Sequence, residues 1–203
     1  RLTPGTVLSL FNSRDGEWDA AVAHAGKHAG TLTVTAQTRA LQPPPDLWLL
    51  FAPIKKARTD FIVEKAVELG VARILPVQTR HTNAERIRQD RLQAHAVEAA
   101  EQCGATFVPT VADLASLDRV LRDWPEGRAL LWCDETAAHA TGTSSPPRGD
   151  EVGVEGTAGQ AGGTSLPPAP AAILIGPEVG FSAEEKQRLR SLPGVFARSL
   201  GPR

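Results

Sequence analysis

Short apolar segments alternate with helical patterns from residue 46 onward, and this alternation restricts the fold more than any other feature of the sequence. Leu47 to Ala52 is a continuous apolar run, typical of a strand covered on both faces, and residues 59–69 place apolar side chains at helical spacing. We expect Thr59 to act as the N-cap of that helix and Gly70 to end it. The pattern predicts an α/β domain with a mostly parallel sheet and helices on both faces.

The rest of this region continues the alternation. We expect strands at 73–77, 107–108, 129–133, 171–175 and 195–200, and helices at 85–103, at 113–123 and after the capping box Ser182-x-x-Glu185. Residues 137–170 consist largely of Gly, Ser, Thr, Pro and Ala, and such a composition buries too little apolar surface to offset the entropy of ordering. We therefore predict a disordered surface insertion there.

The amino-terminal residues differ because they predict only β structure. Strands are expected at 6–11, 18–23 and 31–35, separated by Gly, Asn and Asp turns. Three prolines at 43–45 cannot continue a central strand, so a domain boundary belongs near residues 40–46. We predict a small β-barrel domain over residues 1–42 and the α/β domain over residues 46–203.

Composition excludes several classes of protein. The formal net charge is −1, so the field of the whole molecule does not attract nucleic acid, and any RNA site must be a local patch. No stretch approaches the roughly 20 apolar residues that cross a bilayer. Cys103 and Cys133 have no CxxC or histidine spacing typical of a metal site. We expect a cytoplasmic protein with no membrane segment and no metal and, because the sequence lacks methionine, one that is part of a longer chain.

The loop between the predicted strand 171–175 and the capped helix is the segment most informative about function. In open α/β sheets, ligands bind outside the carboxyl ends of the strands. Gly176 and Gly180 permit a backbone path or a close approach that a Cβ forbids, and Pro177 stiffens the turn. Glu178 is then a charged side chain on a rigid loop. Glycine-rich loops also arise by chance, so the loop alone leaves an ordinary solvated connection open.

Four motifs in the same order resemble the 16S rRNA uracil-N3 methyltransferase family, a branch of the knotted SPOUT methyltransferases. The loop GPEVGFS at 176–182 is similar to that family's GPEGGF signature, and KAVELG at 65–70 is similar to its K-A-x-E-L-G helix end. Residues 98–104 with Val108-Pro109 are similar to its E-A-x-E-Q-S block, and Leu200-Gly-Pro-Arg203 is similar to the start of its L-G-x-R-I-L-R motif. Arg1-Leu-Thr-Pro-Gly5 is similar to a segment of its PUA-like domain.

The resemblance implies a SPOUT trefoil-knot methyltransferase domain over residues 46–203, preceded by a partial PUA-like β domain that binds RNA. It also implies a homodimer that uses S-adenosyl-L-methionine to methylate N3 of a specific uridine in 16S rRNA of the small ribosomal subunit. The implied cofactor contacts lie beside the loop after strand 73–77 and are Leu174, Ile175, Gly176, Pro177, Glu178, Gly180, Leu200, Gly201 and Pro202. Local positive charge makes Lys55, Lys56, Arg58 and Arg80 the RNA-binding candidates.

Methylation at N3 requires that the proton on this nitrogen be lost, so a general base or a group that stabilises the uracil anion is needed. Glu178 and Arg203 are the catalytic candidates: Glu178 as an acid/base or substrate-orienting group, Arg203 as a cation for the uracil oxygens or a phosphate. The alternative for Glu178 is that it only anchors the loop. His81 is the histidine nearest the predicted site.

Some positions depart from the family's pattern. Val179 replaces the second glycine of the loop, Cys103 stands where serine is common, and the sequence ends at Arg203 within the final motif. Three alternatives therefore stay open: a noncatalytic SPOUT-fold RNA-binding protein with a degenerate cofactor pocket, a different SPOUT RNA methyltransferase, and an unrelated α/β domain that binds another small ligand.

Overall fold

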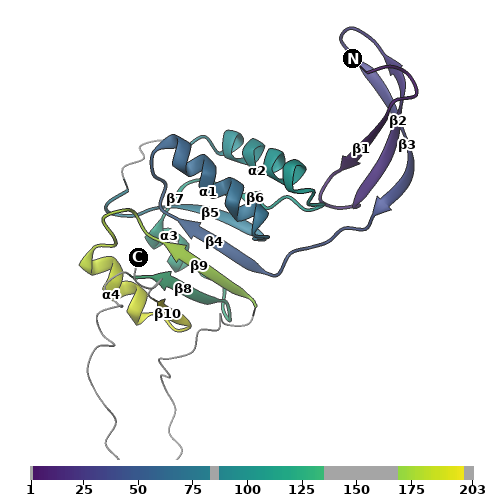
Figure 1. The fold of residues 1–203 in the computed structure, drawn as a ribbon. Helices are drawn as coiled ribbons and strands as arrows, with labels where there is room; N and C mark the ends of the chain where they lie inside the picture. The colour runs from purple at the N-terminus through teal and green to yellow at the C-terminus, as the bar shows by residue number, and fades with distance from the viewer. Residues whose placement is uncertain (1, 83–86, 135–168, 199–203) are drawn as a thin grey trace, which may run out of the picture.

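The computed structural model describes residues 2–82, 87–134 and 169–198. An antiparallel sheet of three strands, β1 (Val7–Phe11), β2 (Glu17–Ala25) and β3 (Gly30–Arg39), extends as a curved arm from an α/β body (Figure 1). The three strands agree with the predicted β domain, and among the described residues they form an open sheet. In the arm, Arg39 bonds to the Glu17 carboxylate and lowers the pKa of Glu17 to about 2.

The arm is attached to the body by the chain and by side-chain contacts. Phe11 packs against the apolar cluster under the first two helices of the body, and the Ser13 hydroxyl accepts a hydrogen bond from the Val108 amide at 2.8 Å. Just before the prolines, the chain reaches the body where the Gln42 amide donates to the Thr106 hydroxyl at 3.0 Å. The connection between the two sheets runs over residues 40–46, and the domain boundary there stays a prediction.

The body contains a seven-stranded sheet, and every strand pair in it is parallel. Its order is β10-β8-β9-β4-β5-β6, with β7 beside β5. The strands are β4 (Leu47–Phe51), β5 (Arg73–Gln78), β6 (Thr110–Val111), β7 (Ala115–Ser116), β8 (Ala129–Cys133), β9 (Ala171–Ile175) and β10 (Val195–Arg198). Because all strands run the same way, their carboxyl ends meet at one edge of the sheet, as the alternating pattern predicted.

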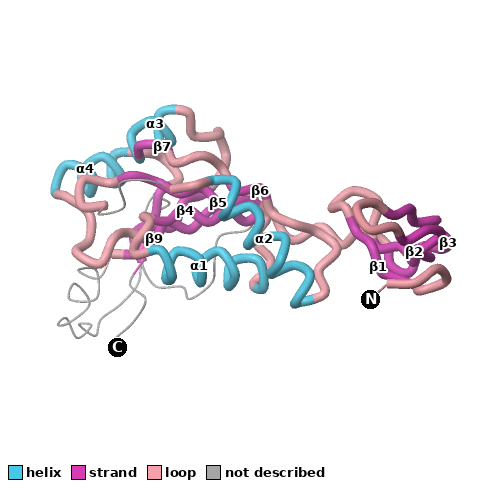
Figure 2. The backbone as a smooth tube through the Cα atoms, turned by 90° about the horizontal axis from the view of Figure 1, so that it is seen from above, coloured by secondary structure: helices cyan, strands magenta, loops and turns pink. Residues whose placement is uncertain are grey.

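Helices cover both faces of this sheet (Figure 2). Helices α1 (Lys56–Glu68) and α2 (Gln89–Cys103) lie on one face, and α3 (Leu117–Arg122) and α4 (Ala183–Ser191) lie on the other. Strand β4 serves both layers: Leu49 and Phe51 join the cluster that includes α1 and α2, whereas Leu50 joins the cluster that includes α3 and α4. This explains why residues 47–51 are apolar without alternation.

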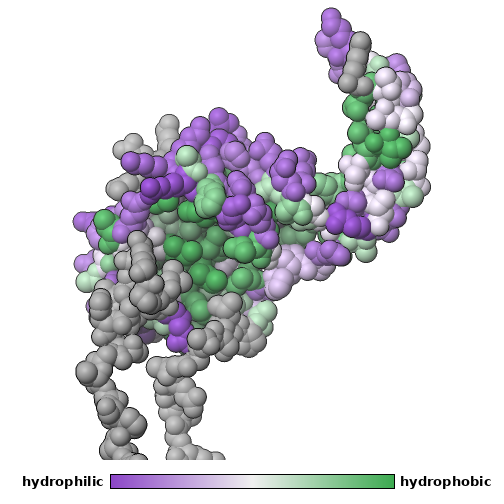
Figure 3. Space-filling model, viewed as in Figure 1, coloured by the Kyte–Doolittle hydropathy of each residue, from purple (hydrophilic) through white to green (hydrophobic). Residues whose placement is uncertain are grey.

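One part of the sheet has apolar side chains that the described helices leave exposed. Register pairs Ile175 with Phe51, so both point to the α1 side, yet Ile175 is 39% exposed and Phe196 on β10 is 46% exposed. Figure 3 shows apolar surface near the middle of the α/β body, over the region of β9. None of the described helices is long and apolar enough to span a membrane.

Several predicted boundaries are wrong, and tertiary contacts explain them. Helix α1 begins at Lys56 and not at Thr59, because the Thr59 hydroxyl points back and donates to the Ile54 carbonyl at 3.0 Å. The predicted end is confirmed, since Gly70 follows Leu69 with a φ of +75°.

The segment around Pro109 also differs from the prediction. Residues 107–108 form no strand; β6 follows Pro109, because the Gln93 side chain accepts from the Val111 amide at 2.9 Å and donates to the Pro109 carbonyl at 3.2 Å. The predicted helix at 113–123 begins only at Leu117, after residues 115–116 have paired with β5. Helix α2 begins at Gln89 and not at residue 85. Most of the predicted insertion lies outside the described residues, which omit 83–86, 135–168 and 199–203.

Candidate functional site

The loops predicted to build the site meet at the carboxyl edge of the sheet. The loop after β9 contacts the chain after β4, where the Ala52 amide donates to the Ile175 carbonyl at 3.0 Å. It also contacts the loop after β5, where His81 Nδ1 lies 3.2 Å from the Gly180 carbonyl oxygen. Two segments that are far apart in the sequence therefore meet beside residues 176–182.

Gly176 and Gly180 are required in this loop for two different reasons. Gly180 adopts a φ of +77°, and its amide donates to the Pro177 carbonyl at 2.8 Å, which closes a tight turn. Gly176 is needed for space, because a Cβ there would lie 2.6 Å from the Phe181 ring. That ring is 6% exposed and packs edge-on against Trp132, with 5.7 Å between ring centroids. The loop is thus fastened to the core at Phe181.

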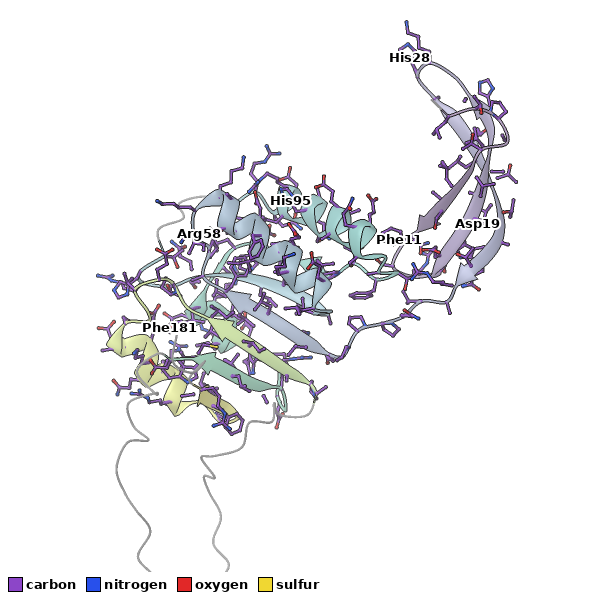
Figure 4. All side chains as sticks on the ribbon, in the orientation of Figure 1. Phe11, Asp19, His28, Arg58, His95 and Phe181 are labelled. Carbon is purple, nitrogen blue, oxygen red and sulfur yellow. The ribbon has the colours of Figure 1, made fainter. Side chains whose placement is uncertain are left out.

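The structure joins one catalytic candidate to one RNA-binding candidate. Arg58 Nη1 lies 2.5 Å from Glu178 Oε1, and the two side chains are 68% and 67% exposed. Figure 4 shows Arg58 on the first turns of α1, on the same side of the body as Phe181 in the loop before α4. Exposed ion pairs contribute only about 0–1 kcal/mol to stability, so either partner can be exchanged for a ligand at small cost.

Arg80 is placed by its backbone. Its amide donates to Glu185 Oε1 at 2.8 Å, and the other oxygen of this carboxylate accepts from the Ser182 amide at 2.8 Å. The Ser182 hydroxyl accepts from the Glu185 amide in return, which confirms the predicted capping box. The loop that carries Arg80 is therefore attached to the start of α4.

Backbone groups and apolar side chains border the loop. Among the described residues, the amides of Gly176, Glu178 and Val179 donate no hydrogen bond to another group of the protein. Beside them, Ile175 is 39% and Val179 is 70% exposed. Free backbone donors next to apolar side chains fit a ligand with a heteroaromatic ring that is recognised by hydrogen bonds rather than by charge.

Sequence reasoning missed Asp134. It directly follows β8, is 4% exposed, and its carboxylate lies 3.0 Å from Lys186 Nζ and 3.6 Å from Arg190 Nη2. The Asp134 amide donates to the Arg198 carbonyl at 2.9 Å, which joins the carboxyl ends of β8 and β10. An acidic residue directly after a buried apolar strand was the available signal, although no recognised motif contains it.

A cleft of about 820 Å³ opens beside the loop, between α3, α4 and the end of β5. Residues of both charge signs line it, among them Gln78, Arg80, Ser116, Ser182, Glu185 and Arg188. Near this edge, burial raises the pKa of the Cys133 thiol, so at neutral pH the thiol is protonated and a poor nucleophile. No cluster of three or more metal-ligating side chains occurs within the described ranges.

The remaining predicted residues fall into three groups. Lys55 and Lys56 are exposed at the start of α1, next to Arg58, so the predicted basic cluster lies together at this edge. The Leu174 side chain is fully buried in the core, so only its backbone can reach a ligand. Leu200, Gly201, Pro202 and Arg203 lie outside the described residues.

Comparisons with known proteins find a matching family and a similar protein. Residues 42–203 match a family described as RNA methyltransferase domain. The chain is 26% identical over 201 residues to ribosomal RNA small subunit methyltransferase E of Rickettsia conorii, a match that covers 99% of this chain and 75% of that protein.

Solved structures are also similar over the full chain. One, from Legionella pneumophila, is assigned as a methyltransferase and contains the bound cofactor S-adenosylmethionine; it is 26% identical with a TM-score of 0.74, over 100% of this chain and 78% of that one. A ribosomal RNA small subunit methyltransferase E from Neisseria gonorrhoeae, bound to S-adenosylmethionine, is 24% identical with a TM-score of 0.79, again over 100% and 78%. At that identity, the second likeness shows the fold alone.

Proposed function

The chain belongs to the RNA methyltransferase domain family, and from this premise we propose that it methylates N3 of a uridine in 16S ribosomal RNA, with S-adenosylmethionine as the methyl donor. The observation that carries the proposal is the loop at residues 176–182, which resembles the GPEGGF signature except at Val179 and lies at the carboxyl edge of the parallel sheet. The relative from Rickettsia conorii supports a ribosomal substrate through its name.

The residues at this edge fit the cofactor. S-adenosylmethionine supplies a methyl group on a positively charged sulfonium when it is bound. We assign its heteroaromatic part to the free backbone amides of Gly176, Glu178 and Val179 and to the exposed side of Ile175. The other proposed contacts are Leu174 through its backbone, Pro177, Gly180, Leu200, Gly201 and Pro202. Because backbone groups do the recognition, no dinucleotide-binding fingerprint is needed.

Glu178 is the proposed base for uridine N3. Its carboxylate is held by Arg58 at 2.5 Å, and both side chains are mostly exposed. A phosphate of the RNA is a strong competitor for the Arg58 guanidinium. On this proposal, RNA binding transfers Arg58 from Glu178 to the phosphate and leaves the carboxylate free to accept the proton. Lys55, Lys56 and Arg80 supply further positive charge for the RNA backbone, and Arg203 remains the second catalytic candidate.

The quaternary and domain arrangement is proposed from the resemblance. It comprises a trefoil knot within residues 46–203, a PUA-like RNA-binding domain within residues 1–42 and a homodimer in the cytoplasm. The exposed Phe196 side chain provides apolar surface that association can bury. Sedimentation of the full chain at micromolar concentration tests the dimer, and a single monomeric species would contradict it.

A second candidate function is suggested by Val179. This residue stands where the family has glycine and is 70% exposed beside the free amides, so its side chain occupies space near the proposed ligand. A protein whose cofactor pocket is blocked in this way would bind RNA without modifying it.

Calorimetric titration with S-adenosylmethionine and S-adenosylhomocysteine separates the two functions. Binding in the micromolar range, followed by transfer of labelled methyl to 16S rRNA or the small subunit, supports the enzyme. Mass spectrometry of the digested RNA then identifies the nucleotide and the ring position. RNA binding without cofactor binding supports the noncatalytic protein.

Replacing Glu178 by Gln tests its role as the base. Loss of a general base lowers kcat by about 10²–10⁴-fold, whereas the affinity for cofactor should change little because the proposed contact is the Glu178 backbone. Glu126→Gln is the control, since Glu126 is exposed in the turn before β8, far from the carboxyl edge. A Glu178→Gln protein that retains more than half of wild-type kcat contradicts the assignment.

A further inference from the structure

Glu185 makes one more contact than a helix cap requires. In a capping box, the glutamate side chain accepts only from the amide of the N-cap residue, here Ser182. Glu185 uses Oε2 for that bond, at 2.8 Å, and uses Oε1 for the amide of Arg80, 105 positions earlier in the chain, at 2.8 Å. The same carboxylate therefore serves helix α4 and the loop after β5.

The loop after β5 is itself a closed turn. The Thr82 hydroxyl accepts from the Thr79 amide at 2.8 Å and lies 2.8 Å from the Thr79 hydroxyl, and Thr79 is 6% exposed. Within this turn, His81 Nδ1 lies 3.2 Å from the Gly180 carbonyl oxygen. Because the turn is closed by its own hydrogen bonds, a few hydrogen bonds to other segments are enough to fix its orientation. The bond from the Arg80 amide to the Glu185 carboxylate is the charge-assisted one.

We propose that Glu185 is a positioning residue that holds Arg80 at the mouth of the cleft between α3 and α4, so that the Arg80 guanidinium can bind an RNA phosphate. Arg80 and Glu185 both line this cleft. No ion pair is found for the Arg80 side chain within the described ranges, so the charge is free for a ligand although the backbone is fastened. The choice of RNA as the ligand rests on the proposed function. The placement of Arg80 rests on the hydrogen bonds alone.

The capping box provides a matched control. Ser182→Ala removes the hydroxyl that accepts from the Glu185 amide and leaves the bond between Glu185 and Arg80 intact. Glu185→Ala removes the acceptor of the Ser182 amide and the bond to Arg80 together. Both variants should lower the melting temperature by a few degrees, because each loses part of a cap. Only Glu185→Ala should weaken RNA affinity, by about tenfold, while cofactor affinity changes by less than about threefold in both.

The RNA measurement uses 16S rRNA and polyuridylate at one fixed salt concentration, since phosphate contacts depend on salt. Glu185→Gln keeps one carbonyl oxygen as an acceptor and should recover part of the affinity. In an Arg80→Ala background, Glu185→Ala should add no further loss, because the residue that it positions is gone. Equal losses for Ser182→Ala and Glu185→Ala, or an undiminished loss in the Arg80→Ala background, would overturn the proposal.

Hydrogen exchange tests the same inference without any ligand. The Arg80 amide should exchange about tenfold faster in Glu185→Ala than in Ser182→Ala, because only the first variant removes its acceptor. Unchanged exchange at Arg80 overturns the positioning role, whatever the activity. If Glu185 protects the Arg80 amide but the protein binds no RNA, the positioning role of Glu185 is retained and the proposed function is rejected.

Discussion

The two edges of the seven-stranded sheet use charged residues in opposite ways. At the amino edge, the Arg128 side chain is 8% exposed; it donates to Asp46 Oδ2 at 2.7 Å and stacks 3.7 Å from the centre of the Trp48 ring. At the carboxyl edge, Arg58 and Glu178 form a pair that is about two-thirds exposed. At the amino edge, the charged side chains connect the starts of neighbouring strands. At the carboxyl edge, the charged side chains are exposed, so a ligand can bind them.

The comparison teaches where stability and function are located in this fold. Arg128 also donates to the carbonyls of Asp46 and Ala171, so one guanidinium connects the starts of β4 and β9. Trp124 packs edge-on against Trp48 at 6.1 Å and extends this arrangement toward α3. We therefore expect substitutions at the amino edge to lower stability more than activity. Substitutions at the carboxyl edge should lower activity more than stability.

The largest effect is expected from Arg128→Ala. The substitution removes three hydrogen bonds of Arg128 and the cation stacked on Trp48, so the free energy of unfolding should fall by about 2–4 kcal/mol. Urea denaturation measures this change, with Arg122→Ala at the exposed end of α3 as the control. The cofactor affinity of the folded fraction should stay within about twofold; a large loss of affinity would show that the two edges are coupled.

Gly176→Ala should have the next largest effect and the opposite signature. Its Cβ would lie 2.6 Å from the Phe181 ring, so the loop or the ring must move. Overpacking of this kind costs about 1–3 kcal/mol, and we expect cofactor affinity to fall by about tenfold or more, with a smaller loss of stability than for Arg128→Ala. The calorimetric dissociation constant measures it. Phe181→Leu in the same chain should restore part of the affinity; no recovery would place the damage elsewhere.

Acid should weaken the ion pair at the amino edge. The Arg128 guanidinium lowers the pKa of Asp46 from its ordinary 3.8, so the ion pair contributes fully above that value and its contribution is lost as pH falls through the lower folded-state pKa. Because Asp46 is 51% exposed, the change should be below about 1 kcal/mol. Urea denaturation at pH 5 and pH 3 measures it. Asp46→Asn should show less of this dependence, and an equal dependence would assign it to other carboxyls.

Val179→Gly should have the smallest effect. The side chain is 70% exposed and no packing is lost, so cofactor affinity should be unchanged or improve by up to about threefold. Stability should fall by less than about 1 kcal/mol, because glycine adds freedom to the unfolded chain. A loss of cofactor affinity greater than tenfold would contradict the assignment of this loop to the cofactor.

Sequence patterns predicted the elements better than their ends. The strands at 129–133 and 171–175 occur as predicted, because each is a complete apolar run, and the cap at Ser182 is encoded within four residues. Thr59 shows the limit: it has the side chain of an N-cap, but its hydroxyl bonds to Ile54 inside a helix that has already begun. Residues 115–116 have a helical pattern yet pair with β5, since strand pairing across the sheet overrode it.

The sequence by itself determined most of the strands and helices and a loop that resembles the family's signature, because these features are encoded by neighbouring residues. Only the tertiary structure placed β9 between β8 and β4. It also joined Arg58 to Glu178 across 120 positions and Arg80 to Glu185 across 105, and it buried Asp134 beside Lys186. Such contacts depend on which strands become neighbours when the whole sheet buries its two apolar faces, and no local pattern encodes that outcome.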